Sequence, residues 1–196
     1  MKIGVFGGTF DPPHAGHLAF ALAAREQLEL DEVLWMPAQR SPQKTEPPLS
    51  SGRDRFAMVG ALASGHEGFA VSDLEIVRGG QSYAVQTMAE LSVARPADYW
   101  FLVGADALKN FSNWKQPDRL MRMCRLAVAL RPPHTRSDVL ARLNPNYESR
   151  IDFVDMPPQD ASSTELRRRL ESGLKPVWLD PNVLQYIEQH GLYRNL

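Results

Sequence analysis

Short apolar runs separated by polar segments form the main pattern along the chain. Residues 2–6 make the first run, which stops at Gly7 and Gly8. Runs of this length that are bounded by glycine or proline are typical of buried strands. Further strands are predicted at residues 32–37, 69–71, 98–103, 126–130 and 151–154, together with an extended piece at 73–77. The pattern therefore predicts a sheet built from short buried strands.

Apolar residues at helical spacing fill the intervals between these runs. Helices are predicted over residues 15–28, from Ser50 or Ser51 through Leu62, from Ser82 through Leu91, around Leu120, and over 137–143, 162–170 and 182–189. Strands that alternate with helices indicate an α/β fold, a Rossmann-like doubly wound parallel sheet with helices on both faces. We expect a single domain over residues 1–196, with a small helical part at about 162–196.

The loops that follow the strands carry the chemically informative residues. In doubly wound sheets, ligands bind beyond the carboxyl ends of the strands. We expect the four loops at residues 7–17, 38–49, 104–106 and 155–164 to converge on one edge of the sheet. Residues 38–49 are polar and broken by prolines, so they can form neither a helix nor a central strand. A loop of that length in a compact domain is usually functional or disordered.

Composition and charge restrict the classes of partner. Apolar residues make up 43% of the chain, charged residues 23%, and the net charge is −1. A nearly neutral chain has no global field to recruit nucleic acid, and no apolar run approaches the roughly 18 residues of a membrane span, so neither partner is expected. Gly7 and Gly8 interrupt the first apolar run, which argues against a signal peptide. We expect a cytoplasmic protein whose single cysteine, Cys124, is a core thiol.

Two histidines stand at the predicted start of the first helix, directly after the glycine-rich loop. Unsatisfied N–H groups at a helix N-terminus bind phosphate, and His14 and His17 are suitable phosphate or proton partners there. The loop contains neither Gly-x-Gly-x-x-Gly nor the Walker sequence. One alternative is a helix cap with a packed imidazole. A zinc pair is another, although Cys or carboxylate ligands at metal spacing are missing nearby.

Residues 8–17, Gly-Thr-Phe-Asp-Pro-Pro-His-Ala-Gly-His, resemble the signature of the HxGH nucleotidyltransferase superfamily at every position. Residues 161–167, Ala-Ser-Ser-Thr-Glu-Leu-Arg, resemble its second signature, Ile-Ser-Ser-Thr-x-Ile-Arg. Alone, Ser-Ser-Thr is an ordinary capping sequence. Paired with the opening loop, the hydroxyls, the helix N-terminus and Arg167 indicate a triphosphate site.

Within that superfamily, the chain resembles the nicotinate mononucleotide adenylyltransferases over nearly its whole length. The matching segments are residues 37–44 with Arg55-x-x-Met58, 75–87, 104–114, 130–132 and 186–193. Two positions depart from the family pattern. Ala84 stands where a threonine often helps to bind the nicotinate carboxylate, and Gln43 stands where a histidine often precedes Lys44. Ala84 leaves the choice between an acid and an amide acceptor open.

The resemblance implies transfer of AMP from ATP to nicotinate mononucleotide, giving deamido-NAD and pyrophosphate in NAD biosynthesis. The same transfer to nicotinamide mononucleotide is one alternative, and pantetheine-phosphate adenylyltransferase is another. A non-catalytic nucleotide sensor is the alternative from a different class. Mg²⁺ is expected to arrive with ATP, because the chain offers no tight carboxylate cluster and no protein metal site is predicted. A homo-oligomer is compatible with the sequence.

The same resemblance assigns roles to individual residues. The implied catalytic residues are His17 at the α-phosphate, His14 on the ATP phosphates, Lys44 on the leaving charge and Arg167 on the β,γ end. The implied ATP-binding residues are Gly7, Gly8, Thr9, Phe10, His14, His17, Gly104, Asp106, Ser162, Ser163 and Arg167. The implied mononucleotide-binding residues are Thr9, Lys44, Ser82, Tyr83 and Trp114, with Trp114 stacking on the pyridine ring or, alternatively, packing in the core. Asp11 is expected to shape the loop rather than act as a base.

Overall fold

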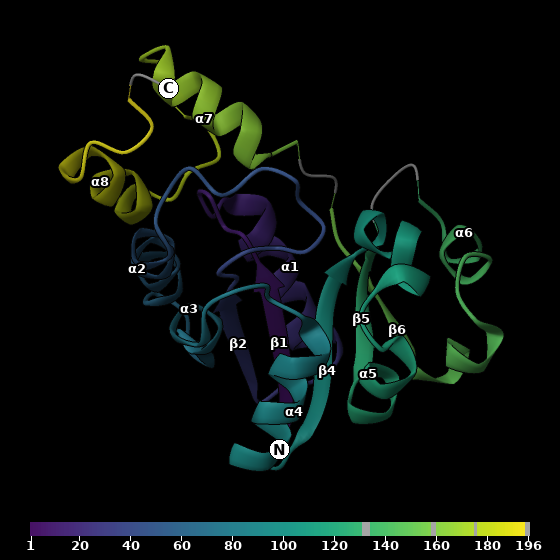
Figure 1. Cartoon of the computed structure of the whole chain (residues 1–196). Coiled ribbons are helices and arrows are strands. Elements are labelled where there is room, and N and C mark those ends of the chain that lie inside the picture. The colour runs from purple at the N-terminus through teal and green to yellow at the C-terminus, as the bar shows by residue number, and fades with distance from the viewer. Residues whose placement is uncertain (131–133, 158–159, 175, 195–196) are drawn as a thin grey trace.

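A single parallel sheet joins the strands of the described chain. The computed structural model describes residues 1–130, 134–157, 160–174 and 176–194. Its strands are β1 (Lys2–Gly8), β2 (Glu32–Pro37), β3 (Phe69–Val71), β4 (Asp98–Gly104), β5 (Arg125–Leu130) and β6 (Ile151–Asp155). They lie in the order β3-β2-β1-β4-β5-β6 (Figure 1). The predicted doubly wound sheet is confirmed.

The winding of the sheet reverses beside β1. This strand pairs in parallel with β2, where Gly7 lies opposite Met36, and on its other side with β4, where Phe6 lies opposite Leu102. Neighbouring crossover connections run in opposite directions at such a point, which leaves a crevice at the carboxyl ends of the strands. The loops after β1 and β4 both begin there.

Helices cover both faces of the sheet, as predicted. One apolar cluster joins the sheet to α1 (Ala15–Gln27), α2 (Gly52–Ala63) and α8 (Pro181–Gln189). The cluster on the other face includes residues of α4 (Ala84–Ala94), η1 (Ala105–Asn113), α5 (Pro117–Met123) and α6 (Arg136–Leu140). The remaining elements are α3 (Leu74–Arg78), η2 (Pro145–Arg150) and α7 (Ser163–Glu171). In Figure 1, α7 lies beyond the carboxyl ends of the strands, and α8 lies beside α2.

The extended piece predicted at residues 73–77 is wrong, because this stretch is the short helix α3. Ser72 accepts a hydrogen bond from the Leu74 N–H at its start, and Gly79 ends it with a φ of 74°. Five residues contain too little sequence to separate a period of 2 from a period of 3.6. The helix α4 also begins at Ala84 rather than Ser82, and Tyr83 is its N-cap residue.

Gly7 and Gly8 belong to β1 and do not form the turn that the sequence predicts. A Cβ atom on Gly8 would lie 2.7 Å from the ring of Phe10, and one on Gly7 would lie 3.0 Å from the ring of Phe101. The glycines are therefore explained by the close approach of two aromatic rings to the strand.

Three smaller observations complete the fold. Cys124 is a free, buried thiol, and burial raises its pKa to about 12, in agreement with the predicted core role. Across the described residues, no helix is both long and apolar enough to cross a membrane. The proline-rich sequence that follows β5, residues 131–133, lies outside the described residues.

Candidate active site

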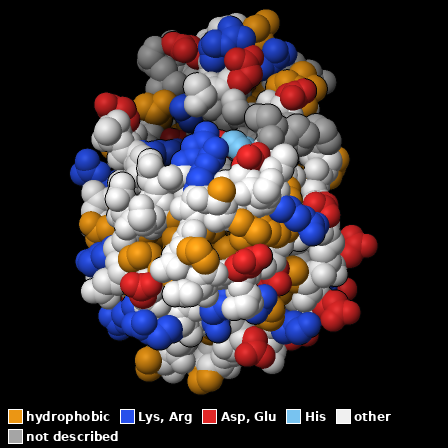
Figure 2. Space-filling view, turned by 90° about the vertical axis from the view of Figure 1, so that its right-hand side faces the viewer, with side chains coloured by type: hydrophobic (Ala, Val, Ile, Leu, Met, Phe, Trp, Pro, Cys, Tyr) orange, Lys and Arg blue, Asp and Glu red, His pale blue; other side chains and the backbone are white. Residues whose placement is uncertain are grey.

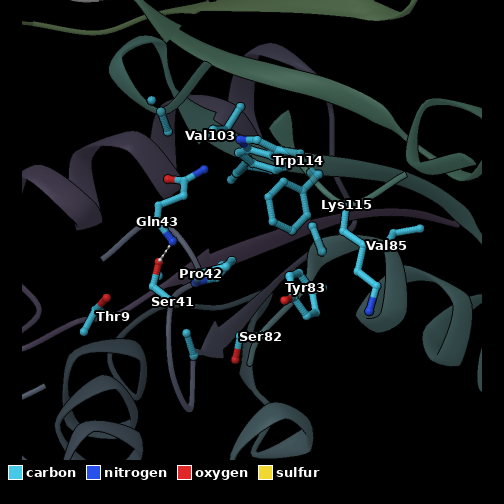
Figure 3. A pocket seen from close by; sticks show the side chains of 18 of the residues that line it. Thr9, Ser41, Pro42, Gln43, Ser82, Tyr83, Val85, Val103, Trp114 and Lys115 are labelled. Carbon is cyan, nitrogen blue, oxygen red and sulfur yellow. Dashed lines mark hydrogen bonds between the residues drawn. The ribbon is translucent and has the colours of Figure 1, made fainter. Parts of the chain in front are cut away.

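A cavity of about 560 Å³ lies at the carboxyl ends of β1 and β4. Eight of the site residues predicted from the sequence line it, namely Gly7, Gly8, Thr9, Ser82, Tyr83, Gly104, Asp106 and Trp114. Of the four loops predicted to converge, those after β1, β2 and β4 do so here, whereas the fourth, at residues 155–164, contains two residues, 158–159, outside the described ones. Figure 3 shows how the labelled side chains from these loops surround a common space.

Trp114 packs against the core and also lines the cavity. Its half-buried indole packs against the rings of Phe111, with centroids 5.1 Å apart, and Phe101, at 6.1 Å. The same indole lines the cavity. Packing on one side holds the ring while the other side offers an aromatic surface to a planar ligand.

Ser82 connects the cavity wall to the loop at residues 38–49. Its hydroxyl accepts a hydrogen bond from the Gln39 N–H at 2.9 Å, and its own N–H donates to the Arg40 carbonyl at 2.9 Å. Ser41, Pro42 and Gln43 of the same loop also line the cavity. The loop is thus anchored to the segment that precedes α4.

His14 and His17 lie at the N-terminus of α1 with their rings stacked, the centroids 3.7 Å apart. Nδ1 of His17 accepts a hydrogen bond from the His14 backbone N–H at 3.2 Å. Because Nδ1 is an acceptor, a neutral His17 carries its proton on Nε2. His17 also packs edge-on against Phe10, whose ring is only 2% exposed. The side chain of Phe10 therefore belongs to the core, so any contact to phosphate comes from its backbone.

The N-terminus of α7 lies against the loop that follows β1. The Ser163 hydroxyl donates to the Pro12 carbonyl at 2.9 Å, and Arg167 donates to the Asp11 carbonyl at 2.7 Å. Ser162 is the N-cap residue, and its hydroxyl accepts a hydrogen bond from the Glu165 N–H. The second signature is thus brought to the first, with Ser162 in the ordinary capping role. Figure 2 shows Lys and Arg side chains gathered beside a histidine on one face of the molecule.

Asp11 fixes the shape of the loop after β1. Its buried carboxylate accepts hydrogen bonds from the backbone N–H groups of Leu49 and Ser50, at 2.8 and 3.4 Å, and from the Tyr193 hydroxyl at 2.6 Å. Three segments that are distant in sequence therefore meet at one carboxylate. This agrees with the structural role expected for Asp11.

Arg55 is a second buried side chain that fixes the loops after β1 and β2. Its guanidinium is almost fully buried and donates to the carbonyls of Thr9, Ala38, Gln39 and Ser50. These carbonyls belong to the ends of β1 and β2 and to the start of α2, so one side chain ties the two loops together. The cost of burying its charge is reduced by the nearby Asp11 carboxylate.

Lys44 lies in the loop at residues 38–49, and its charged neighbours are Arg167, Asp11 and Arg55. Burial lowers the pKa of its ammonium, the neighbouring Arg167 guanidinium lowers it further, and Asp11 acts in the opposite direction. The side chain as a whole is exposed. Lys44 and Arg167 therefore place two positive charges beside Asp11, in the loop after β1.

Asp106 leads into η1 at the end of the cavity formed by β4. Its carboxylate contacts the Lys109 ammonium at 2.8 Å and Nε2 of His134 at 2.9 Å. Both partners hold the carboxylate at the start of η1, beside Gly104. His134 was not identified from the sequence, since it lies 28 residues further along the chain.

Glu75 is a cavity-lining residue that sequence reasoning missed. The carboxyl is buried, accepts a hydrogen bond from the Thr87 hydroxyl, and lies 3.8 Å from the Arg78 guanidinium. Burial raises its pKa, and the Thr87 hydrogen bond acts in the opposite direction. Gln43, Asn110, Asn113 and Lys115 also line the cavity without having been assigned. The polar loops around Trp114 and Lys44 were the signal available for them.

Glu75→Gln is expected to change how stability depends on pH. A raised pKa in the folded state means that the folded protein binds more protons, so the Glu75 contribution to stability is lost as pH rises from the ordinary value of 4.5 through the raised value. The free energy of unfolding of Glu75→Gln relative to wild type should therefore increase with pH, by at most about 1.4 kcal/mol per pH unit in that window. Urea unfolding at several pH values measures it.

Glu29→Gln serves as the matched control for that measurement. Glu29 is highly exposed and pairs with Lys2 at the opposite end of β1. Its substitution should leave the pH dependence close to that of wild type. Equal slopes for Glu29→Gln and Glu75→Gln would contradict the interpretation.

The predicted residues thus form two adjoining groups. Gly7, Gly8 and Thr9 lie in the wall of the cavity, whereas His14, His17, Lys44, Ser162, Ser163 and Arg167 lie outside its lining and surround the loop after β1. Arg167 and Ser163 are joined to that loop by hydrogen bonds. In the part of the chain that the structure describes, no group of three or more His, Cys, Asp or Glu side chains could hold a metal ion.

Comparison with known proteins identifies the family. The cytidylyltransferase-like family model matches residues 5–169. A protein of Synechococcus sp. (strain JA-3-3Ab), described as a probable nicotinate-nucleotide adenylyltransferase, is 40% identical over 195 residues, which cover 98% of this chain and 94% of that protein. The chain belongs to the nicotinate-nucleotide adenylyltransferase family. A family member from Dictyoglomus thermophilum is 37% identical and is covered over 100% of its length.

Solved structures agree with this family at the level of the fold. The Plasmodium falciparum nicotinic acid mononucleotide adenylyltransferase complexed with NaAD has a TM-score of 0.79 and covers 98% of this chain and 97% of its own, at 16% identity. A putative nicotinate-nucleotide adenylyltransferase from Vibrio parahaemolyticus has a TM-score of 0.67 at 21% identity and covers 100% of this chain and 96% of its own. The adenylyltransferase fold is therefore retained where the sequences have diverged.

Proposed function

We propose that this chain transfers the adenylyl group of ATP to nicotinate mononucleotide, giving deamido-NAD and pyrophosphate. The proposal rests on one observation, which is that the cavity and the loop after β1 adjoin each other. A cavity containing a half-buried indole adjoins the loop after β1, which leads into two stacked histidines and is contacted by Arg167 of α7, with Lys44 of the loop at residues 38–49 close to Arg167 and Asp11. The cavity suits a planar heterocycle with its ribose, and the loop suits a triphosphate. Family membership supports the same reaction.

The reaction is a direct displacement at phosphorus. A phosphate oxygen of the acceptor forms a bond to the α-phosphorus of ATP. The bond from that phosphorus to the bridging oxygen breaks, and pyrophosphate leaves with the electron pair. No covalent intermediate with the protein is required, so the protein acts by positioning and by stabilising charge.

Each residue of the site has a proposed task. His17 donates from Nε2 to the α-phosphate as negative charge develops there, and His14 with the backbone of Gly7, Gly8, Thr9 and Phe10 holds the phosphates. Ser162, Ser163 and Arg167 hold the β,γ end, Lys44 stabilises the leaving charge, and Gly104 with Asp106 holds the adenosine ribose. Thr9, Lys44, Ser82, Tyr83 and Trp114 hold the mononucleotide. Mg²⁺ accompanies ATP as part of the substrate.

One assay tests the proposal against its alternatives. Purified protein is incubated with Mg²⁺-ATP and, separately, nicotinate mononucleotide, nicotinamide mononucleotide or phosphopantetheine, and pyrophosphate release is followed. We expect release to be fastest with the nicotinate acceptor. Release with none of the three would favour a nucleotide sensor. Faster release with the amide or with phosphopantetheine would replace the proposed acceptor.

Trp114→Leu is expected to raise KM for the acceptor by about tenfold, because stacking a base on an aromatic ring is worth about 1–3 kcal/mol. KM for ATP should be nearly unchanged, since His14 and His17 are not among the residues that line the cavity with Trp114. Trp114→Phe keeps an aromatic face and should recover most of the loss. Steady-state kinetics with each substrate varied in turn measure both constants, and an equal rise in both would argue against stacking.

A further inference from the structure

We propose that Lys115 determines acceptor specificity by presenting its ammonium to the carboxylate of the pyridine ring. This proposal rests on the proposed function and deepens it, because it identifies the group that distinguishes the acid acceptor from the amide. The two acceptors differ in one substituent, which is anionic in the acid and neutral in the amide. A cation at that substituent therefore favours the acid.

The position of Lys115 suits this task. It directly follows Trp114, and both side chains line the cavity. The Lys115 ammonium lies 4.2 Å from the centroid of the Tyr83 ring, on the opposite wall. Figure 3 shows Lys115 extending from the Trp114 segment towards the start of α4. A ring stacked on Trp114 would therefore have an edge within reach of this ammonium.

The charges around the cavity make Lys115 distinctive. Three charged side chains occur among the described residues that line it, Glu75, Asp106 and Lys115. The first two are acidic, and each has partners of its own: Thr87 and Arg78 contact Glu75, and Lys109 and His134 contact Asp106. Lys115 is the one cation in that described lining. Without it, the charged side chains of that lining would all be acidic.

The neighbouring side chains of Ala84 and Ser82 are poor donors for the carboxylate of the pyridine ring. Ala84, which begins α4 and also lines the cavity, ends in a methyl group. The Ser82 hydroxyl is engaged with the Gln39 N–H. A flexible lysine that rests on an aromatic ring can move a short distance to a bound anion, because its contact with Tyr83 is weak at an exposed site. The Lys115 ammonium is therefore held beside the cavity and is free to move to a bound anion.

The test is a comparison of the two acceptors in Lys115→Met, which keeps most of the side-chain volume and removes the charge. We expect kcat/KM for nicotinate mononucleotide to fall about five- to tenfold, mainly through KM, as for loss of a partly exposed charge pair. For nicotinamide mononucleotide it should change by less than about twofold. Lys115→Arg should retain most of the preference for the acid. Raising the NaCl concentration should weaken that preference in wild type and much less in Lys115→Met.

Lys2→Met is the matched control. Lys2 is also a lysine, pairs with Glu29, and lies at the far end of β1 from the cavity. Its substitution removes the same charge from the protein and should alter neither acceptor, because the distance exceeds the range of screened interactions.

The possible outcomes separate this proposal from the proposed function. An equal fall for both acceptors in Lys115→Met would mean that the side chain only supports Tyr83 or Trp114, and it would overturn the specificity role. No fall for either acceptor would overturn it as well. A wild-type protein that releases no pyrophosphate with the nicotinate acceptor would instead contradict the proposed function.

Discussion

Replacing His17 by alanine is expected to lower kcat by about 10²- to 10³-fold, the usual effect of removing one donor to a charge that develops in the transition state. The structure supports a donor at this position, because Nδ1 of His17 accepts the His14 backbone N–H and so leaves the proton on Nε2. The stacked ring of His14 further fixes the orientation. KM for ATP should change much less than kcat. Single-turnover measurements at saturating ATP isolate this step.

His66→Ala is the control for the loss of an imidazole. His66 lies just before β3, at the end of the sheet away from the cavity, where its ring packs near Phe69. Its removal should leave kcat within about twofold of wild type. A His17→Ala protein that keeps its thermal stability and full turnover would remove His17 from the proposed mechanism.

Asp11→Ala is expected to lower the free energy of unfolding by about 3–5 kcal/mol, the range for breaking a buried charge arrangement. The substitution removes the acceptor of two backbone N–H groups and of the Tyr193 hydroxyl. It also leaves the buried Arg55 guanidinium without a neighbouring negative charge. Urea unfolding followed by tryptophan fluorescence gives the difference.

A surface aspartate provides the comparison. Asp31 also accepts a backbone hydrogen bond, from Lys2 at 2.7 Å, but it is exposed, so Asp31→Ala should cost less than about 1 kcal/mol. Tyr193→Phe should cost about 1–2 kcal/mol in the wild-type protein and less in the Asp11→Ala background, because the shared hydrogen bond is already lost. Additive effects of the two substitutions would show that they do not act through that bond.

Much of the sheet and half of the site were predictable from local sequence. The buried strands are short apolar runs, and polar loops follow them, so the crevice at their carboxyl ends could be located before the structure was known. Trp114, Tyr83 and Asp106 were assigned from the resemblance to the family, and all three line the cavity. Their grouping follows from topology, which the alternation of strands and helices already indicates.

The parts that sequence reasoning missed depend on contacts between distant residues. Glu75 resembles an ordinary surface acid, and only its burial against Thr87 and Arg78 makes it part of the cavity wall. Gly7 and Gly8 indicate a turn in the sequence, but they are glycines because Phe101 and Phe10 approach the strand. The helix α3 was missed because five residues carry no clear period.

The hydrogen bond between Asp11 and Tyr193 has a consequence for the order of folding. It joins residues that are 182 positions apart, so the loop after β1 cannot take its final shape until nearly the whole chain has been synthesised. Contacts of such long sequence separation form late, since the entropy of the intervening chain must be lost first. The loop after β1, although it precedes most of the fold in the sequence, is therefore expected to be completed among the last elements.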